Sequence, residues 1–200
     1  MVAAAVYAPA DLELAHLCAS GDRVAQSRLF DNYVGNVHAT LYRILGSNRD
    51  IDDLIQESFI QIFSSLSSYR GDARLTTWVA RISARVALAH LARKRPRSVA
   101  LETVPEPVPE PQSSERRIMA REVGRRLYAL LDQLDPRHRI AFTLHIIDGR
   151  SLKEVAAITE SSVAAVKSRV WRTRRRVQRD PVVAEFLDGA AAVTGGEHRE

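Results

Sequence analysis

Prolines divide this chain into two parts. Five of its eight prolines lie between Pro96 and Pro111, and from Pro105 onward they alternate with other residues. Alternating prolines favour an extended, polyproline-like backbone and cannot form a helix interior. The acidic residues among them keep this segment in water. We therefore expect residues 97–115 to be an acidic, proline-rich linker between two folded domains.

The rest of the chain has the pattern of amphipathic helices. Apolar residues recur at three- and four-residue steps on both sides of the proline segment, and no alternating strand pattern of any length occurs. The steps predict helices over about 22–45, 50–68, 77–95, 116–134, 136–148, 152–158 and 163–179. We predict an all-α fold of two small helical domains, residues 10–96 and 116–180, with a C-terminal tail over residues 181–200.

Residues that commonly cap helices stand at several of the predicted ends. Asp, Ser and Thr side chains accept hydrogen bonds from the first N–H groups of a helix, and Gly adopts the left-handed conformation that often follows its last turn. These signals locate helix ends independently of the apolar period. The expected capping residues are Asp22, Gly46, Thr76 or Thr77, Asp135, Ser151 and Ser162.

The composition excludes several classes of protein. With 46% hydrophobic and 26% charged residues among 200, the chain can bury a core and is not disordered throughout. The single cysteine, Cys18, excludes an intramolecular disulfide and a cysteine-based zinc site. No stretch reaches the roughly 18 apolar residues of a membrane span, and the apolar N-terminus lacks the basic residues of a signal peptide. We expect a cytoplasmic protein without membrane insertion.

Motifs of catalysis and of cofactor binding are missing from the sequence. It holds no phosphate-binding loop, no dinucleotide-binding glycine motif and no His or Cys spacing typical of metal ligands. The six histidines are scattered. We therefore expect a protein that is not an enzyme, with no catalytic residue, no cofactor and no metal site.

Basic residues gather near the C-terminus. The net charge is +5, and Lys167–Arg179 holds seven basic residues in thirteen positions without an acidic one. A helix face that contacts only solvent usually carries both positive and negative charges. A purely basic block therefore indicates that the partner is a polyanion such as nucleic acid. A merely solvated basic face is the alternative.

A short predicted helix, a tight turn and this basic helix follow one another over residues 151–176. Ser151 and Glu154 form a capping box at the start of the short helix. This is the anatomy of a helix-turn-helix, whose second helix enters the major groove of DNA. A helical hairpin with a basic face is the alternative. The apolar residues expected where the two helices cross are Val155, Ala156, Ile158, Val163, Val166 and Val170.

Three segments of the chain resemble one family. They are LIQESFIQIF at 54–63, SYRGDARLTTW at 68–78 and LDPRHRIAFTLHIIDGRSLKEVAAITESSVAAVKSRVWRTRRR at 134–176. In this order they are similar to an extracytoplasmic-function (ECF) sigma factor. The resemblance implies a promoter-specificity subunit that directs transcription initiation by recognising −35 duplex and melted −10 promoter DNA. Its implied partners are core RNA polymerase (the largest-subunit coiled coil and the flap), promoter DNA and an anti-sigma factor.

The resemblance also implies that the first domain docks on polymerase through the helix that contains residues 54–63. Acidic and amide groups on one helix face can pair with basic residues of a partner helix. For the two aspartates, the alternative is that they stabilise the N-terminus of their own helix. The matching positions are Asp52, Asp53, Gln56, Glu57 and Gln61.

The −10 element is assigned by the resemblance to the loop before the 77–95 helix and to that helix. An unpaired base would enter the loop, and arginines would contact the strand's backbone. For Trp78, the alternative to a DNA contact is a buried position in the core. Family members commonly carry Asn in place of Arg85 and Asp in place of Ala89, so Arg85 could hold a phosphate instead of reading a base. The matching residues are Arg70, Gly71, Asp72, Arg74, Thr76, Thr77, Trp78 and Arg85.

The −35 element is assigned by the resemblance to the start of the basic helix. Some side chains would meet base edges and others phosphates. Many members carry Leu in place of Thr159 and Gly in place of Glu160, so the turn departs from the family pattern. The matching residues are Ser162 as the cap, Lys167, Ser168, Trp171 and Arg172 for base edges, and Arg169, Arg175 and Arg176 for phosphates.

Two other functions fit the same residues. The chain could be a helix-turn-helix regulator that binds duplex DNA without polymerase and oligomerises through residues 10–95. It could also be a degenerate sigma-like interaction module, for which the Arg85 and Ala89 departures are the only support. The linker would thread toward the RNA exit channel of polymerase by the resemblance, or it is a plain spacer.

Overall fold

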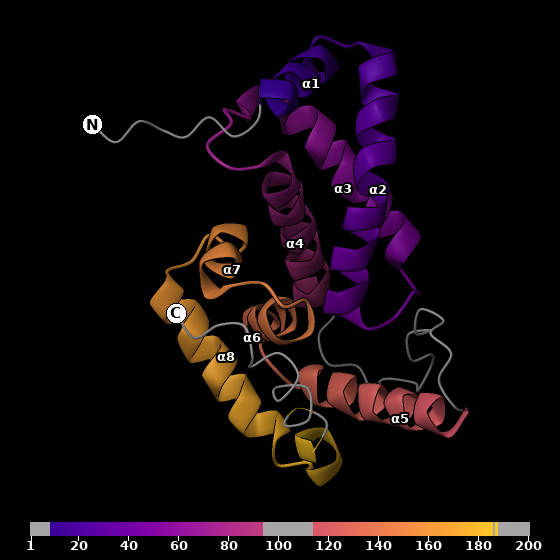
Figure 1. Cartoon of the computed structure of the whole chain (residues 1–200), viewed down its shortest axis with the longest axis vertical. Helices are drawn as coiled ribbons and strands as arrows, with labels where there is room; N and C mark the ends of the chain where they lie inside the picture. The colour runs from indigo at the N-terminus through magenta and orange to yellow at the C-terminus, as the bar shows by residue number, and fades with distance from the viewer. Residues whose placement is uncertain (1–8, 94–113, 186, 188–200) are drawn as a thin grey trace.

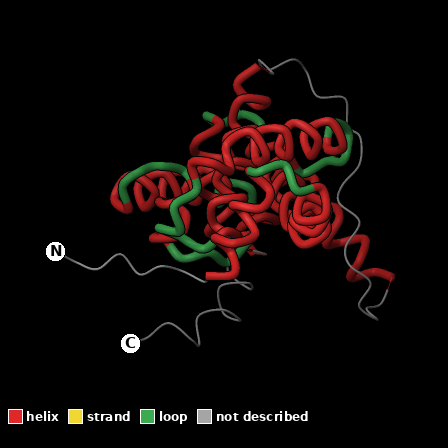
Figure 2. Tube along the Cα trace, turned by 90° about the horizontal axis from the view of Figure 1, so that it is seen from above, coloured by secondary structure: helices red, strands yellow, loops and turns green. Residues whose placement is uncertain are grey.

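The computed structural model describes residues 9–93, 114–185 and 187, and within each of the two long ranges helices are joined by short loops (Figures 1 and 2). No strand occurs in these residues, so the all-α prediction is confirmed. The predicted linker lies outside them except for Ser114 and Glu115, which already belong to α5. The elements are α1 (Pro9–Ala19), α2 (Arg23–Leu45), α3 (Ile51–Ser65), a 3₁₀ turn η1 (Leu66–Ser68), α4 (Leu75–Arg93), α5 (Ser114–Leu131), α6 (Pro136–Phe142), a π turn η2 (Thr143–Ile147), α7 (Leu152–Ile158) and α8 (Val163–Val177).

In the first domain, α2 packs against α1, α3 and α4. The side chains of Leu29, Val37 and Leu41 on α2 are fully buried and face apolar residues of the neighbouring helices. Both predicted caps of α2 are present. Asp22 accepts hydrogen bonds from the N–H groups of the first turn, and Gly46 follows the helix with φ of 70°.

The apolar period predicts no helix before residue 22, but the structure has one there, α1. Ala15 and Cys18 are buried against the first domain's core. Near its start, Asp11 accepts a hydrogen bond of 3.2 Å from the backbone N–H of Leu75, the first residue of α4. The prediction that Thr76 or Thr77 caps this helix is therefore wrong. Both threonines lie inside its first turn, and the cap comes from 64 residues away.

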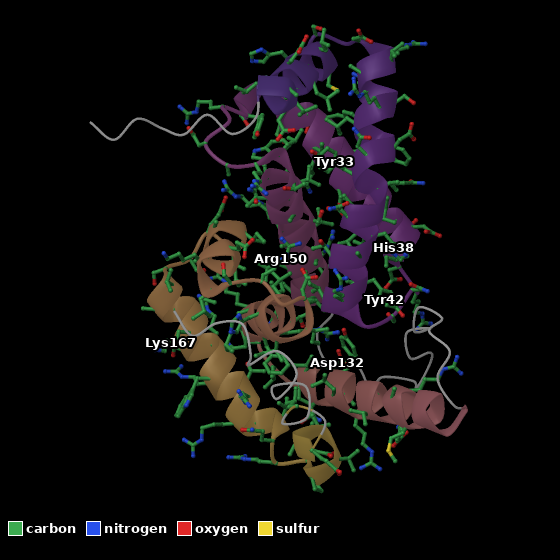
Figure 3. The ribbon with its side chains drawn as sticks, viewed as in Figure 1. Tyr33, His38, Tyr42, Asp132, Arg150 and Lys167 are labelled. Carbon is green, nitrogen blue, oxygen red and sulfur yellow. The ribbon has the colours of Figure 1, made fainter. Side chains whose placement is uncertain are left out.

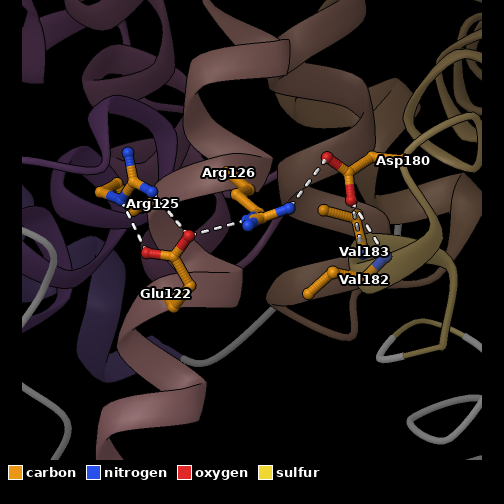
Figure 4. A network of polar contacts seen from close by, with 6 residues as sticks. All are labelled: Glu122, Arg125, Arg126, Asp180, Val182 and Val183. Atoms are coloured by element: carbon orange, nitrogen blue, oxygen red, sulfur yellow. Dashed lines mark hydrogen bonds and ion pairs between the residues drawn. The ribbon is translucent and has the colours of Figure 1, made fainter.

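Part of the second domain has a core of its own, whereas the buried apolar residues of α7 and of the first half of α8 join the first domain's core. Leu131, Phe142 and Val177 are fully buried there, and Val183 and Leu187 from beyond α8 pack against them. Asp180 turns the chain by accepting hydrogen bonds from the N–H groups of Val182 and Val183 (Figure 4). The apolar residues after Asp180, which have no role in the sequence pattern, therefore close the core of this domain.

Arginines also hold this end of the second domain together. Arg126 lies 3.9 Å from the carboxylate of Asp180 and 2.7 Å from that of Glu122, which also pairs with Arg125 (Figure 4). The hydrogen bonds from the two arginines lower the pKa of Glu122 to about 2. The Glu122 carboxylate therefore stays charged well into the acid range.

The two domains pack against each other, with α6 and α7 against α4 and η2 against α2 (Figure 1). Arg139 of α6 is only 3% exposed, and its guanidinium donates hydrogen bonds of 2.7 and 2.6 Å to the carbonyls of Ile44 and Leu45. The last carbonyls of a helix have no partner within it, so Arg139 satisfies the C-terminus of α2. A second charge, Asp132, pairs with the same guanidinium.

Tyr128 of α5 strengthens this contact. Its hydroxyl donates a 2.5 Å hydrogen bond to the carbonyl of Arg43, and its burial raises the pKa of this phenol to about 12. Its ring lies against Gly46, where a Cβ atom would clash with the ring carbons. Position 46 therefore requires glycine for two reasons, the left-handed backbone and the close approach of the second domain.

Candidate nucleic-acid interface

The basic helix α8 presents one buried and one charged face. Val166, Val170 and Val177 face the protein, and Ser162 caps the helix by accepting a 3.2 Å hydrogen bond from the N–H of Ala165. Lys167 lies on α8 at the outer edge of the molecule (Figure 3). The other exposed side chains of the predicted −35 set are Trp171, Arg172, Arg175 and Arg176.

Aromatic and basic groups meet on this exposed face. The Arg175 guanidinium lies 4.9 Å from the centre of the Trp171 ring, which is 56% exposed. A shallow pocket beside them is lined by arginines and Trp171. Two predicted residues differ: Ser168 is partly buried, and Arg169 is partly buried and donates a 2.8 Å hydrogen bond to the Ser161 hydroxyl in the turn. The structure thus brings most of the predicted −35 residues onto one surface.

The helix pair α7–α8 has the predicted helix-turn-helix geometry. Ser151 and Glu154 form the capping box, and hydrogen bonds from Ser151 lower the pKa of Glu154. Five of the six apolar residues expected at the crossing are buried, but Val163 is 42% exposed because it opens α8 on the solvent side. In the turn, Glu160 takes the left-handed conformation with φ of 50°, which strains any residue with a side chain.

The loop over residues 70–74 precedes α4 and has an exposed rim. Arg70, Asp72 and Arg74 are exposed, whereas Gly71 is buried with φ of 76°. The hydroxyl of Tyr69 donates a 2.8 Å hydrogen bond to the Ala73 carbonyl and closes the loop from inside. These residues and the exposed Thr76 share the N-terminal end of α4.

Two predicted −10 residues of α4, Trp78 and Arg85, lie apart from this rim. Trp78 is partly buried against the core and meets the ring of Tyr69 edge to face, with ring centres 5.6 Å apart. This position fits the core alternative for Trp78. Arg85 is exposed and lies further along α4, toward the second domain.

Arg85 faces Glu160 across the domain contact. A guanidinium nitrogen of Arg85 lies 3.3 Å from the Glu160 carboxylate, and one of Arg81 lies 3.8 Å from it. Two departures from the family pattern, Arg85 and Glu160, therefore pair with each other. Arg81 was missed by sequence reasoning, because its partner stands in the other domain. The groove at this contact is lined by Arg81, Ala84, Arg85, Leu88, Arg137, Ile140, Ile158, Thr159, Glu160, Ser161 and Arg169.

The exposed face of α3 carries the residues predicted to dock on polymerase. Three of them are exposed: Asp52, Asp53 and Gln56. Glu57 and Gln61 are partly buried, and the Gln61 amide nitrogen lies 3.4 Å from a carboxylate oxygen of Glu57. Ile60 stands on the same face, is 69% exposed and was not among the predicted residues. Its position outside the buried stripe of α3 was the signal that could have identified it as an exposed apolar side chain.

In the part of the chain that the structure describes, no group of three or more His, Cys, Asp or Glu side chains could hold a metal ion. Within the same residues, no helix has the length and apolar character needed to cross a membrane.

Comparisons with known proteins match both domains. Residues 29–97 match the family profile of Sigma-70 region 2, and residues 124–177 match that of Sigma-70, region 4. The chain is 30% identical over 166 residues to the ECF RNA polymerase sigma-E factors of Salmonella typhimurium (strain LT2) and Escherichia coli (strain K12), covering 78% of this chain and 86% of each relative. The sigma-E factor of Haemophilus influenzae is 27% identical over 177 residues, covering 84% and 93%.

Two solved structures share the fold. The structure of CnrH in complex with the cytosolic domain of CnrY has a TM-score of 0.59 at 25% identity, and the match covers 90% of this chain and 99% of CnrH. The sigma factor RpoE of Bartonella quintana, solved with the anti-sigma factor NepR, has a TM-score of 0.55 at 22% identity, covering 76% and 94%.

Proposed function

Because this chain belongs to the ECF sigma factor family, we propose that it joins core RNA polymerase and directs transcription initiation at selected promoters. The observation that carries this proposal is the presence of both sigma regions, in order, on one chain. Sigma factors are initiation factors that act by binding, so we propose no catalytic step for this chain. Its place of action would be the cytoplasm, where the polymerase works.

We propose that the second domain, near residues 116–180, reads the −35 duplex through α8. The first turns of a recognition helix reach base edges in the major groove, and we propose that Lys167, Ser168 and Arg172 contact bases there. Trp171 would contact a base edge or a thymine methyl through its exposed ring. Arg175, stacked on that ring, would meet a phosphate beside it, as would Arg176.

The first domain, near residues 10–96, would bind the melted −10 strand at the loop over residues 70–74. Its exposed Arg70 and Arg74 can contact the strand's backbone while the buried Gly71 keeps the loop tight. Thr76 and Thr77 in the first turn of α4 would add hydrogen bonds. Trp78, packed against Tyr69, would support the loop from inside.

Polymerase would dock on α3 through Gln56, Glu57 and Ile60. The exposed isoleucine supplies apolar contact at the centre of this face, and the polar groups around it would fix the register of a partner helix. The acidic pair Asp52 and Asp53 would favour a basic partner surface. Their position at the start of α3 also stabilises that helix.

The domain contact has a consequence for this function. Arg81 and Arg85 pair with Glu160, so its carboxylate competes with a phosphate for both guanidinium groups while the domains are in contact. We propose that the two domains separate when the chain binds polymerase. Binding of this chain by a protein partner other than polymerase is a further proposal, since CnrH was solved with the cytosolic domain of CnrY.

Run-off transcription with purified core polymerase tests the proposal. A random-promoter template pool should yield defined transcripts when core and this chain are both present, and none when either is absent. Binding of promoter duplex with equal affinity in the absence of core would favour the helix-turn-helix regulator instead. Tight binding to core without any transcript would favour the degenerate interaction module.

A further inference from the structure

The N-terminus of α4 is capped by a residue from another helix. The first N–H groups of any helix lack partners within it, and a side-chain oxygen usually supplies one. At α4 this oxygen belongs to Asp11 of α1, 3.2 Å from the Leu75 N–H. The bond fixes the point at which the 70–74 loop ends and α4 begins.

The same helix also supports the loop itself. The Leu12 side chain lies against Gly71, and its carbons stand 3.1–3.3 Å from the place of a Cβ on that glycine. Gly71 is buried with φ of 76°, so the loop turns sharply where it rests on Leu12. On the other side, Tyr69 is only 4% exposed and its burial raises the pKa of the phenol to about 12, which keeps it a neutral donor to the Ala73 carbonyl.

These contacts hold the inner side of the loop and leave its outer rim in solvent. A loop that selects a base gains affinity and selectivity when it is fixed before binding, because less conformational entropy is lost. We infer that Asp11 and Leu12 are positioning residues for −10 recognition, with α1 as the platform on which the loop is set. This inference rests on the proposed function of the loop.

The experiment compares holoenzymes that differ only in α1. A −10 strand is selected from a random single-stranded pool by wild-type holoenzyme, and its affinity is compared with that of strands changed at one base. Asp11→Ala should reduce this discrimination about fivefold, the effect typical of a lost cap. Asp11→Asn should restore it, because the amide oxygen still accepts from Leu75. Glu13→Ala, an exposed acid on the same helix, is the matched control and should behave as wild type.

Discrimination between −35 duplexes by the same holoenzymes separates positioning from general damage. It should stay at the wild-type value in every α1 variant. Leu12→Ala keeps the cap and removes the support under Gly71, so it should also lower −10 discrimination. It serves as the test variant if Asp11→Ala does not fold.

Three results would overturn the inference. They are unchanged −10 discrimination in both Asp11→Ala and Leu12→Ala, an equal loss at −35, or no rescue by Asp11→Asn. A wild-type holoenzyme that discriminates no −10 strand would refute the loop's proposed function as well, whereas variants that match a discriminating wild type would refute the α1 inference alone.

Discussion

Replacing Glu160 with Gln should make this chain bind core polymerase more tightly. The change removes the carboxylate that pairs with Arg85 at 3.3 Å and with Arg81 at 3.8 Å. The side chains of Glu160 and Arg85 are more than half exposed, so each pair contributes at most about 1 kcal/mol. Loss of both should cost the closed arrangement about 1 kcal/mol, which raises the population of separated domains about fivefold.

The apparent Kd for core polymerase reports this population directly. When only the open chain can bind, the apparent Kd is the intrinsic value divided by the open fraction, so it should fall about fivefold in Glu160→Gln. Glu185→Gln, an exposed acid of the same domain, makes the same charge change away from the contact and should leave the Kd unchanged. The advantage of Glu160→Gln should shrink at high salt, because salt already screens the exposed pairs in the wild type.

A double-mutant cycle tests whether Glu160 and Arg85 act through each other. Arg85→Gln should tighten polymerase binding through the same lost pair, and the double variant should gain less than the sum of the two single changes. If Glu160→Gln and Arg85→Gln leave the Kd unchanged, or if their effects simply add, the ion pair does not hold the domains together.

The remaining predictions concern the two interfaces and the acid stability of the second domain. Arg172→Ala should cost about 1–3 kcal/mol of DNA binding and relax the preference at one −35 position; an equal loss on every sequence would assign Arg172 to a phosphate. If about 4–6 of the basic residues in Lys167–Arg179 meet phosphates, the plot of log K against log salt for duplex binding should have a slope of about −4 to −5, and a flat plot would refute this. Gln56→Ala with Glu57→Ala should weaken polymerase binding at unchanged circular dichroism, and an unchanged Kd would remove the docking face. The folded-state pKa of Glu122, about 2, lies below its unfolded value, so its contribution to stability is present above pH 4.5 and lost as the pH falls toward 2; melts of Glu122→Gln should lack this part of the acid destabilisation.

Local signals in the sequence were enough to place most helices. Asp22, Gly46 and the capping box of Ser151 and Glu154 act within a few residues of themselves, so their roles can be read without knowing the fold. The same holds for α8, whose buried valines and charged face follow the helical period. Most of the predicted −35 residues therefore came together on one surface, whereas Ser168 and Arg169 are partly buried.

Contacts between distant residues could not be predicted in this way. The cap on α4 comes from Asp11, and the polar groups at the end of α2 are satisfied by Arg139, 94 or 95 residues further along the chain. Nothing in the local pattern around Arg139 distinguishes it from the solvated arginines nearby, yet it is 3% exposed. Because the partners of these residues are distant in sequence, the prediction was of two separate domains. In the structure, the domains pack together through Arg139, Tyr128 and Glu160.

The short turn that begins at Asp180 determines where the second domain can be truncated for separate study. Val183 and Leu187 pack in one apolar cluster with Leu131 and Phe142. A fragment that stops at the end of α8 would lack Val183 and Leu187 and expose the rest of this cluster to solvent. Such a fragment should aggregate or unfold at a lower temperature than the longer domain. Weak DNA binding by this fragment would then reflect its lost stability and not the affinity of the intact domain. Expression boundaries for this half should run past Leu187, and affinity tags placed there need a spacer.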